Sequence, residues 1–260
     1  DPDARAVLEA LPSEVKAHAV AYGVTPANME GLFGQVLIES ESESAGSGVE
    51  HMTLHLPAAI TGAASELALP VSLRIPGLHN ARNAAAAITA AVMLGVPAEK
   101  ATEAAGSFLG AARRFQIRGV VKQVTVVDDY AHHPTEISAL LAAARRRYPE
   151  STIRVLFQPH LFSRTRFFAH EFAEALALAN DVIVTGVFPA REKQSDFPEV
   201  GASTIVNAAH GLKHDDGWIH AVDDMRTAAQ MMALRSHHGD VVLTVGAGDI
   251  TEMGDVILAA

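Results

Sequence analysis

Short runs of apolar and β-branched residues alternate with helical patterns from about residue 115 to the end of the chain. In the stretch 135–147, apolar side chains recur at spacings of three and four residues and so form one stripe along a helix. The same patterning predicts strands over 120–127, 153–157, 181–185, 218–222 and 241–245, and helices over 135–147, 166–179, 201–212 and 224–236. Strands that alternate with helices predict an α/β fold whose parallel sheet is covered on both faces.

The part of the chain before about residue 115 has a different texture. Apolar and polar residues alternate in 51–56 and in 67–73, which predicts two half-buried strands. We expect a helix over 3–10 and two more over 81–94 and 98–109, separated by Gly95 and Pro97. The Glu/Ser/Gly-rich run between residues 39 and 48 predicts a solvated loop between strands.

Composition excludes several classes of protein. Among the 260 residues, 30 are acidic and 20 are basic, and the net charge of −10 argues against a nucleic-acid-binding face and against a polybasic membrane-surface segment. The chain has no cysteine, which excludes disulfides, thiolate catalysis and cysteine-ligated zinc. Its most apolar run, 84–96, is too short for a membrane span of roughly 20 residues and is expected to be a core helix.

Unusual polar residues follow directly after the expected strands. In open α/β sheets, ligands bind outside the carboxyl ends of the strands, so these positions are candidates for a site. They are Asp128-Asp129-Tyr130-Ala131-His132-His133, then Gln158-Pro159-His160 with Ser163-Arg164, then Pro189-Ala190-Arg191-Glu192, and finally Gly246-Ala247-Gly248-Asp249.

Each of these groups also has a purely structural interpretation. Asp128 and Asp129 could cap the following helix, and His160 could be a packed loop residue. His132 and His133 could form a metal pair, but adjacent histidines on one chain rarely face one ion.

The glycines after the last expected strand could begin a dinucleotide-binding fingerprint. Its third glycine would fall at Thr251, and the motif would sit on the last strand instead of the first, so we do not expect NAD binding. Gly246 and Gly248 are better interpreted as a tight turn with close backbone approach.

Two further stretches carry candidate binding residues. Asn80 and Asn83 are three residues apart at an expected helix start, and their amides suit the edge of a purine; the alternative is that Asn80 caps the helix. Arg113 and Arg114 lie at the junction of the two segments, where they could clamp a phosphate or simply form a charged hinge.

Together these stretches resemble the Mur ligases, the ATP-dependent amino-acid-adding enzymes of peptidoglycan synthesis. The resemblance rests on Gly-Leu-His-Asn-x-x-Asn (77–83), Arg-Arg-Phe (113–115), Asp-Asp-Tyr-Ala-His-His-Pro-Thr-Glu-Ile (128–137), Phe-Gln-Pro-His (157–160), Ser-Arg-Thr (163–165) and Gly-Ala-Gly-Asp-Ile (246–250). It favours the branch that joins L-alanine to UDP-N-acetylmuramate through an acyl phosphate. The branch that recycles murein peptides and a non-catalytic nucleotide-binding module stay open as alternatives.

The resemblance also implies a domain organisation. Residues 1–115 would be the last part of a central ATP-binding α/β domain, and residues 116–260 a C-terminal Rossmann-like domain with a mostly parallel sheet. No Gly-Lys-Thr or Gly-Lys-Ser phosphate loop occurs in the chain. We therefore expect that loop, the UDP-sugar domain and the main Mg²⁺ ligands upstream, and we expect the 260 residues alone to be inactive.

Candidate roles carry over only where residues match the family's motifs. The resemblance implies an ATP site formed by His79, Asn80, Asn83, Arg114, Asp129 and Tyr130. It implies an L-alanine pocket formed by His132, His160 and Arg164, although many relatives have arginine where this chain has Leu161. It assigns no metal ligand and no catalytic residue within the chain. ATP, Mg²⁺, UDP-N-acetylmuramate and L-alanine are the implied ligands of a cytoplasmic bacterial enzyme, and a homodimer stays open.

Overall fold

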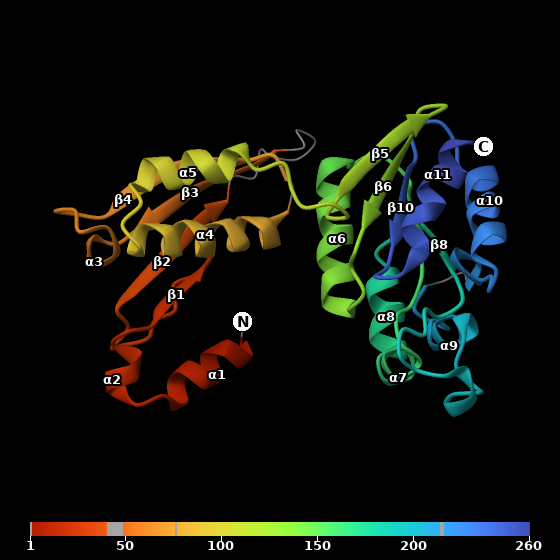
Figure 1. The fold of residues 1–260 in the computed structure, drawn as a ribbon, viewed down its shortest axis with the longest axis horizontal. Coiled ribbons are helices and arrows are strands. Elements are labelled where there is room, and N and C mark those ends of the chain that lie inside the picture. Colours follow the sequence, from red (N-terminus) through yellow and green to blue (C-terminus); the bar gives the residue numbers. More distant parts are fainter. Residues whose placement is uncertain (1, 41–48, 76, 214–215) are drawn as a thin grey trace. The chain divides into compact units, whose positions relative to one another are not determined.

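The computed structural model describes residues 2–40, 49–75, 77–213 and 216–260. The chain forms two compact units, Asp1–Leu109 and Gly110–Ala260 (Figure 1). The sequence division at residue 115 differs from this boundary by six residues, so the Arg-Arg-Phe stretch belongs to the second unit.

The first unit contains a four-stranded sheet in the order β1-β2-β3-β4, in which β1 and β2 are parallel and the other neighbours are antiparallel. The strands are β1 (Val20–Gly23), β2 (Gly34–Ser40), β3 (Glu50–Leu56) and β4 (Leu67–Leu73). The helices are α1 (Pro2–Ala10), α2 (Ser13–Lys16), α3 (Ala58–Thr61), α4 (Leu78–Met93) and α5 (Ala98–Ser107).

Alternation in β3 determines which face of this sheet is buried. Met52 and Leu54 point into a core that also contains Ala85 and Ile88 of α4, while the intervening residues of β3 are only partly buried. The structure confirms the strands and helices expected in this unit, and it adds β1 and β2, which the sequence did not predict. Of the expected loop over 39–48, residues 39 and 40 end β2, and the rest lies outside the described residues.

The second unit contains a six-stranded sheet in the order β5-β6-β10-β7-β8-β9. All of its neighbours are parallel except β5 and β6, which confirms the mostly parallel sheet. The strands are β5 (Gln116–Val121), β6 (Val124–Asp129), β7 (Ile153–Phe157), β8 (Asp181–Val184), β9 (Ile219–Ala221) and β10 (Val241–Val245).

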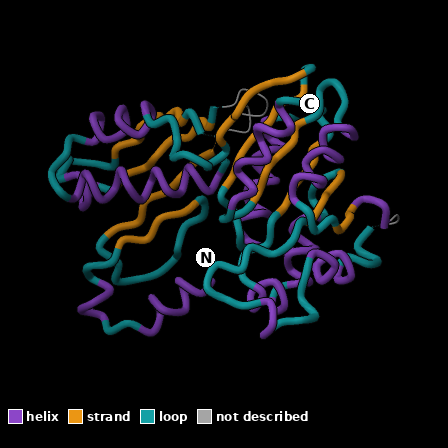
Figure 2. The backbone as a smooth tube through the Cα atoms, turned by 45° about the vertical axis from the view of Figure 1, so that its right-hand side comes forward, coloured by secondary structure: helices purple, strands orange, loops and turns teal. Residues whose placement is uncertain are grey.

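Helices cover both faces of this sheet (Figures 1 and 2). The α-helices are α6 (Pro134–Arg147), α7 (Phe162–Phe167), α8 (Ala169–Leu176), α9 (Ala202–Ala208), α10 (Met225–Arg235) and α11 (Met253–Leu258), and the 3₁₀ turns are η2 (Gln194–Asp196), η3 (Asp216–Trp218) and η4 (Asp249–Glu252). Leu243 of β10 packs in one core with α6, α8 and α9, and its neighbour Val242 packs in the other with α10 and α11. Successive residues of the strand thus pack in the cores on opposite faces of the sheet, as the two-residue period requires.

Two expected elements are wrong because each is divided into two shorter elements. The expected strand 120–127 is a hairpin of β5 and β6, since Lys122 and Gln123 adopt left-handed conformations with φ of 48° and 62°. The turn contains neither glycine nor asparagine, the residues that usually mark such hairpins. The expected helix 166–179 is divided into α7 and α8 at Phe168, whose ring packs against His133 and Phe172.

Candidate functional site at the carboxyl edge of the second sheet

Three loops meet at one edge of the second unit's sheet. The register aligns the last residues of three neighbouring strands, Asp129 of β6, Val245 of β10 and Phe157 of β7. The helices that follow β6 and β7 lie on one face, whereas α11, which follows β10, lies on the other. Loops that leave neighbouring strands toward opposite faces open a crevice at the sheet edge, which is where ligands bind in folds of this class.

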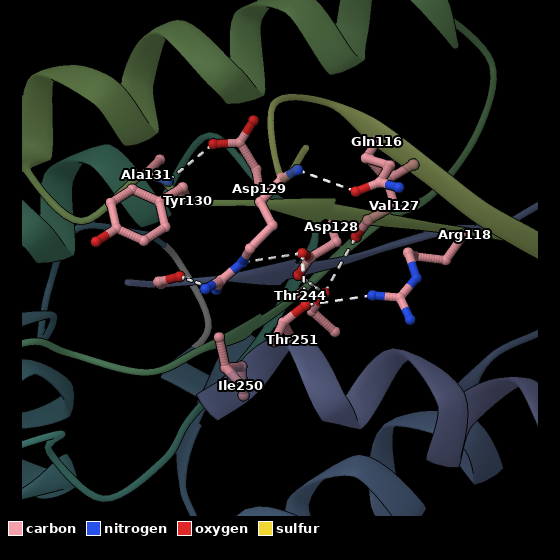
Figure 3. A network of polar contacts seen from close by, with 12 residues as sticks. Gln116, Arg118, Val127, Asp128, Asp129, Tyr130, Ala131, Thr244, Ile250 and Thr251 are labelled. Atoms are coloured by element: carbon pink, nitrogen blue, oxygen red, sulfur yellow. Dashed lines mark hydrogen bonds and ion pairs between the residues drawn. The ribbon is translucent and has the colours of Figure 1, made fainter. Parts of the chain in front are cut away.

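Asp128 is completely buried at this edge and is held on both carboxylate oxygens. Its Oδ1 accepts a hydrogen bond from the Thr244 hydroxyl at 2.6 Å, and its Oδ2 accepts one from the Thr251 hydroxyl at 2.8 Å (Figure 3). The Arg113 Nε lies 3.1 Å from Oδ2. With these three donors, the Asp128 carboxylate joins β6, β10, η4 and the segment before β5.

Asp129 points to the opposite face of the sheet and has different partners. Its Oδ2 accepts the Phe115 backbone N–H at 2.7 Å, and its Oδ1 accepts the Ala131 N–H at 2.8 Å. Burial raises the pKa of Asp129, although the two N–H groups and the charge of Arg114 act to lower it. Asp129 therefore orders the backbone on both sides of the site and lies close to a cation.

Neither aspartate caps α6, so that structural interpretation is wrong. His133 is the N-cap, and Glu136 accepts the backbone N–H groups of His132 and His133. The two adjacent histidines also face different neighbours, because the ring of His132 lies near that of His160 and the ring of His133 near that of Phe168.

A row of aromatic and cationic side chains runs along the loops. The Arg114 guanidinium lies 5.9 Å from the centre of the Tyr130 ring, and the Tyr130 ring lies 5.2 Å from that of His132. His132 is 5.7 Å from His160, whose ring stacks on Phe188. The structure thus brings four candidate residues of the second unit, Arg114, Tyr130, His132 and His160, into one continuous row.

His160 lies between apolar and cationic neighbours. Burial lowers the pKa of His160, and the positive charge of Arg164 lowers it further. Within the described residues, its Nδ1 atom is buried without a hydrogen-bond partner. The lowered pKa favours the neutral imidazole at pH 7.

Arg164 lines an open depression in the surface at α7. It shares this depression with Ser163, Arg166 and Phe167, and its Nη1 lies 3.4 Å from the His132 carbonyl oxygen. The Ser163 hydroxyl and amide both donate to Glu192, and these bonds lower the pKa of Glu192 although burial acts to raise it.

Leu161, which stands where many relatives have arginine, is buried and takes a left-handed conformation with φ of 69°. Its N–H donates to the Phe188 carbonyl, and its carbonyl accepts the Thr165 hydroxyl. The residue therefore shapes the turn into α7 and adds no charge to the depression.

The glycine turn after β10 packs directly on the loop after β7. A side chain at Gly246 would lie 2.6 Å from the Gln158 carbonyl oxygen, and Gly246 also has φ of 147°. A side chain at Gly248 would collide with the Gln158 amide and with the Phe188 ring. This close approach confirms the interpretation as a tight turn, and it explains why both positions need glycine.

The first unit carries the remaining candidates at the start of α4. Its N-cap is Gly77, so the alternative that Asn80 caps this helix is wrong. His79, Asn80 and Asn83 lie in the first two turns, at spacings of three and four that put them on one face of the helix. His79 and Asn80 are half-buried and Asn83 is exposed.

Sequence reasoning missed two residues that organise these sites. Glu50 is buried in β3, and its Oε2 accepts the Gly77 N–H at 3.0 Å, which holds the start of α4. The signal was available, because alternation puts Glu50 on the same face as Met52 and Leu54. The sequence suggested for Arg113 a phosphate clamp or a charged hinge, and nothing in the local pattern shows that its side chain would reach Asp128.

The described residues contain no group of three or more histidine and carboxylate side chains that could hold a metal ion. No helix among the same residues is both long enough and apolar enough to cross a membrane.

A mostly parallel sheet covered on both faces, with carboxylates, arginines and histidines along its carboxyl edge, is typical of α/β domains that bind charged small molecules. The family model of the Mur ligase glutamate ligase domain matches residues 113–248. The chain belongs to the Mur ligase family.

Known proteins resemble the chain well beyond that domain. It is 67% identical to a UDP-N-acetylmuramate–L-alanine ligase of Bifidobacterium longum subsp. infantis over its full length, and it covers 52% of that protein. The crystal structure of the UDP-N-acetylmuramate–alanine ligase of Thermotoga maritima matches 98% of the chain and 54% of its own length, with a TM-score of 0.69 and 26% identity. A MurF ligase of Thermotoga maritima in complex with ADP has the same fold, with a TM-score of 0.60 at 20% identity over 86% of this chain and 46% of its own. The chain spans about half the length of the curated relatives it matches.

Proposed function

We propose that this chain is part of an ATP-dependent ligase that joins L-alanine to UDP-N-acetylmuramate. The observation that carries the proposal is the 67% identity, over the whole chain, to a ligase of that name. The reaction would proceed in two steps. ATP phosphorylates the carboxylate of the sugar's lactyl group, and the amine of L-alanine then attacks the acyl phosphate, forming the amide and releasing phosphate.

The chemistry of the carboxyl edge supports this reaction. Its side chains are arginines, histidines and carboxylates in positions where they bind and orient charged groups, and such positioning is the main contribution that a protein makes to phosphoryl transfer. The exposed Arg114, beside Asp129 and Tyr130, would contact the nucleotide phosphates. In the first unit, Asn83 would contact adenine, with His79 and Asn80 next to it on α4.

The depression at α7 would bind L-alanine. Arg164, which lines the depression, would pair with its carboxylate, while His132, which Arg164 contacts, and the neighbouring His160 would lie beside the bound amino acid. Because its lowered pKa favours the neutral imidazole, His160 does not repel the ammonium group of an amino acid. Magnesium would neutralise phosphate charge in such a reaction, but the described residues offer no cluster for it, so we assign it no ligand here.

The proposal is tested with the full-length gene product by following phosphate release. Turnover should require ATP, UDP-N-acetylmuramate and L-alanine together. The Arg164→Ala variant should raise the KM for L-alanine far more than the KM for ATP, because a charge-assisted partner of the carboxylate is lost, worth about 2 kcal/mol or more. The Asn83→Ala variant should raise the KM for ATP, whereas Asn207→Ala, a matched change of an exposed asparagine on α9, should alter neither constant.

Each alternative gives a different result in the same assay. A murein-peptide recycling enzyme would use a tripeptide in place of L-alanine. A non-catalytic nucleotide-binding module would bind ATP without releasing phosphate. Either outcome would overturn the proposal.

A further inference from the structure

We infer that Arg113 is a positioning residue that holds Arg114, Tyr130 and the glycine turn after β10 in place for nucleotide binding. The inference rests on the proposed function, because it assumes that Arg114 and Tyr130 contact ATP. It gives Arg113 a role distinct from that of Arg114, although the two are neighbours of the same type.

The Arg113 side chain is turned into the second unit and is only 21% exposed. Its Nε donates to Asp128 Oδ2 at 3.1 Å, and its Nη2 donates to the Gly246 carbonyl at 2.6 Å. Its guanidinium carbon also lies 5.0 Å from the centre of the Tyr130 ring. One side chain therefore touches the loop after β6, the loop after β10 and the buried carboxylate between them.

The Arg113 backbone is fixed as firmly as its side chain. Its N–H donates to Gln116 Oε1 at 3.0 Å, and its carbonyl accepts the Tyr130 N–H at 2.7 Å. Two residues later, the Phe115 N–H donates to Asp129 Oδ2 at 2.7 Å. The two adjacent carboxylates of β6 thus anchor the residues on either side of Arg114. Asp128 holds the side chain of Arg113, and Asp129 holds the backbone of Phe115.

This anchoring determines where Arg114 can point. Arg113 and Phe115 both adopt left-handed conformations, with φ of 59° and 48°, which non-glycine residues take only where the surroundings enforce them. Between these two fixed residues, Arg114 remains exposed, with its guanidinium 5.9 Å from the Tyr130 ring centre. A residue held in this way reaches its ligand with less loss of conformational freedom.

Arginine is required at this position for geometric reasons. Its planar fork donates to two acceptors on different loops and leaves a flat face for the Tyr130 ring, whereas lysine offers one compact donor group. Lysine could keep the charge beside Asp128 but could not also bridge to Gly246 and lie over the ring. We therefore expect Arg113→Lys to recover only part of what Arg113→Met loses.

The test compares Arg113→Met, Arg113→Lys and a matched control in the full-length gene product. The control is Arg145→Met, which removes donors to the Ser151 carbonyl and to Asn180 at the other edge of the sheet. Arg113→Met should raise the KM for ATP about tenfold and change the KM for L-alanine less than twofold, with Arg113→Lys in between. In an Arg114→Ala background, Arg113→Met should raise the KM for ATP by a smaller factor than in the unmodified protein, because part of its effect passes through Arg114.

Hydrogen exchange measured by mass spectrometry adds a readout that does not depend on turnover. Exchange in 128–132 and 246–250 should become faster in Arg113→Met and stay unchanged in Arg145→Met. Unchanged exchange in these loops would overturn the inference, and so would an unchanged KM for ATP or full additivity with Arg114→Ala. Failure of the proposed function would appear separately, as absence of ligase turnover in the unmodified protein.

Discussion

Replacing Gly248 by alanine tests how closely the two loops at the carboxyl edge are packed. A methyl group at this position would lie 2.7 Å from two ring carbons of Phe188 and even nearer to the Gln158 Oε1 atom. Real Cβ atoms do not approach other atoms so closely, so one of these neighbours has to move.

Neither Gln158 nor Phe188 can move without losing stabilising contacts. The Gln158 side chain is buried, and it donates to Asp249 at 2.6 Å and accepts from the Ile250 N–H at 3.1 Å. Phe188 stacks on His160, and its backbone is bonded to Pro159 and Leu161. Overpacking costs about 1–3 kcal/mol, and the loss of one of the two hydrogen bonds of Gln158 adds about 1 kcal/mol, so we expect the free energy of unfolding to fall by about 2–4 kcal/mol.

The chain supplies its own control and its own probe. At Gly254 in α11, an added methyl group would meet its neighbours at 3.7 and 3.8 Å, which are ordinary contact distances. Gly254→Ala should therefore stabilise the helix by about 0.5–1 kcal/mol. The single tryptophan of the chain, Trp218, is buried in the second unit, so its fluorescence in a urea titration reports the unfolding of that unit.

The expected result is a lower urea midpoint for Gly248→Ala and a slightly higher one for Gly254→Ala. A free energy of unfolding for Gly248→Ala within about 0.5 kcal/mol of that of the unmodified chain would refute the reasoning, since changes of that size are typical of unconstrained surface positions. It would mean that the loops after β7 and β10 can separate without loss.

Two further predictions concern the same unit. Gln123→Gly should stabilise it by about 0.5 kcal/mol in the same titration, because glycine relieves the left-handed conformation at the turn between β5 and β6; a lower midpoint would show that the turn is not strained. The lowered pKa of His160 means that the folded protein binds a proton there less readily than the unfolded chain, so acidification below the unperturbed value of 6.5 should cost stability. His160→Gln should remove this part of the loss between pH 7.5 and 5, and parallel stability profiles for the two proteins would contradict the assignment.

Local patterns in the sequence were sufficient to predict most helices and strands of the second unit. The strands 153–157 and 241–245 were predicted to the residue, because each is a short buried run between clear breaks. The helix expected over 135–147 matches α6 except that α6 begins one residue earlier, at Pro134. The carboxyl-edge location of the candidate residues also followed, since alternating strands and helices imply a parallel sheet and parallel strands end at the same edge.

Other features depend on pairing between distant segments, which local periodicity does not encode. Nothing in 241–245 shows that this last strand inserts between β6 and β7, yet that insertion brings Thr244 to Asp128 and the glycine turn onto Gln158. The hairpin at Lys122 and Gln123 was missed because its turn uses residues that do not usually favour it.

The two adjacent aspartates show most clearly which features the sequence determines and which depend on the tertiary structure. The sequence placed Asp128 and Asp129 directly after an expected strand, and the structure extends that strand, β6, to Asp129, so that the two neighbours point to opposite faces. Only the tertiary structure decided what each face contains: two threonines and an arginine around Asp128, and two backbone N–H groups near the cationic Arg114 around Asp129. The physical reason is that side-chain direction is a property of the strand itself, whereas the partners come from segments as far as 123 residues away along the chain, brought there by packing of the whole unit.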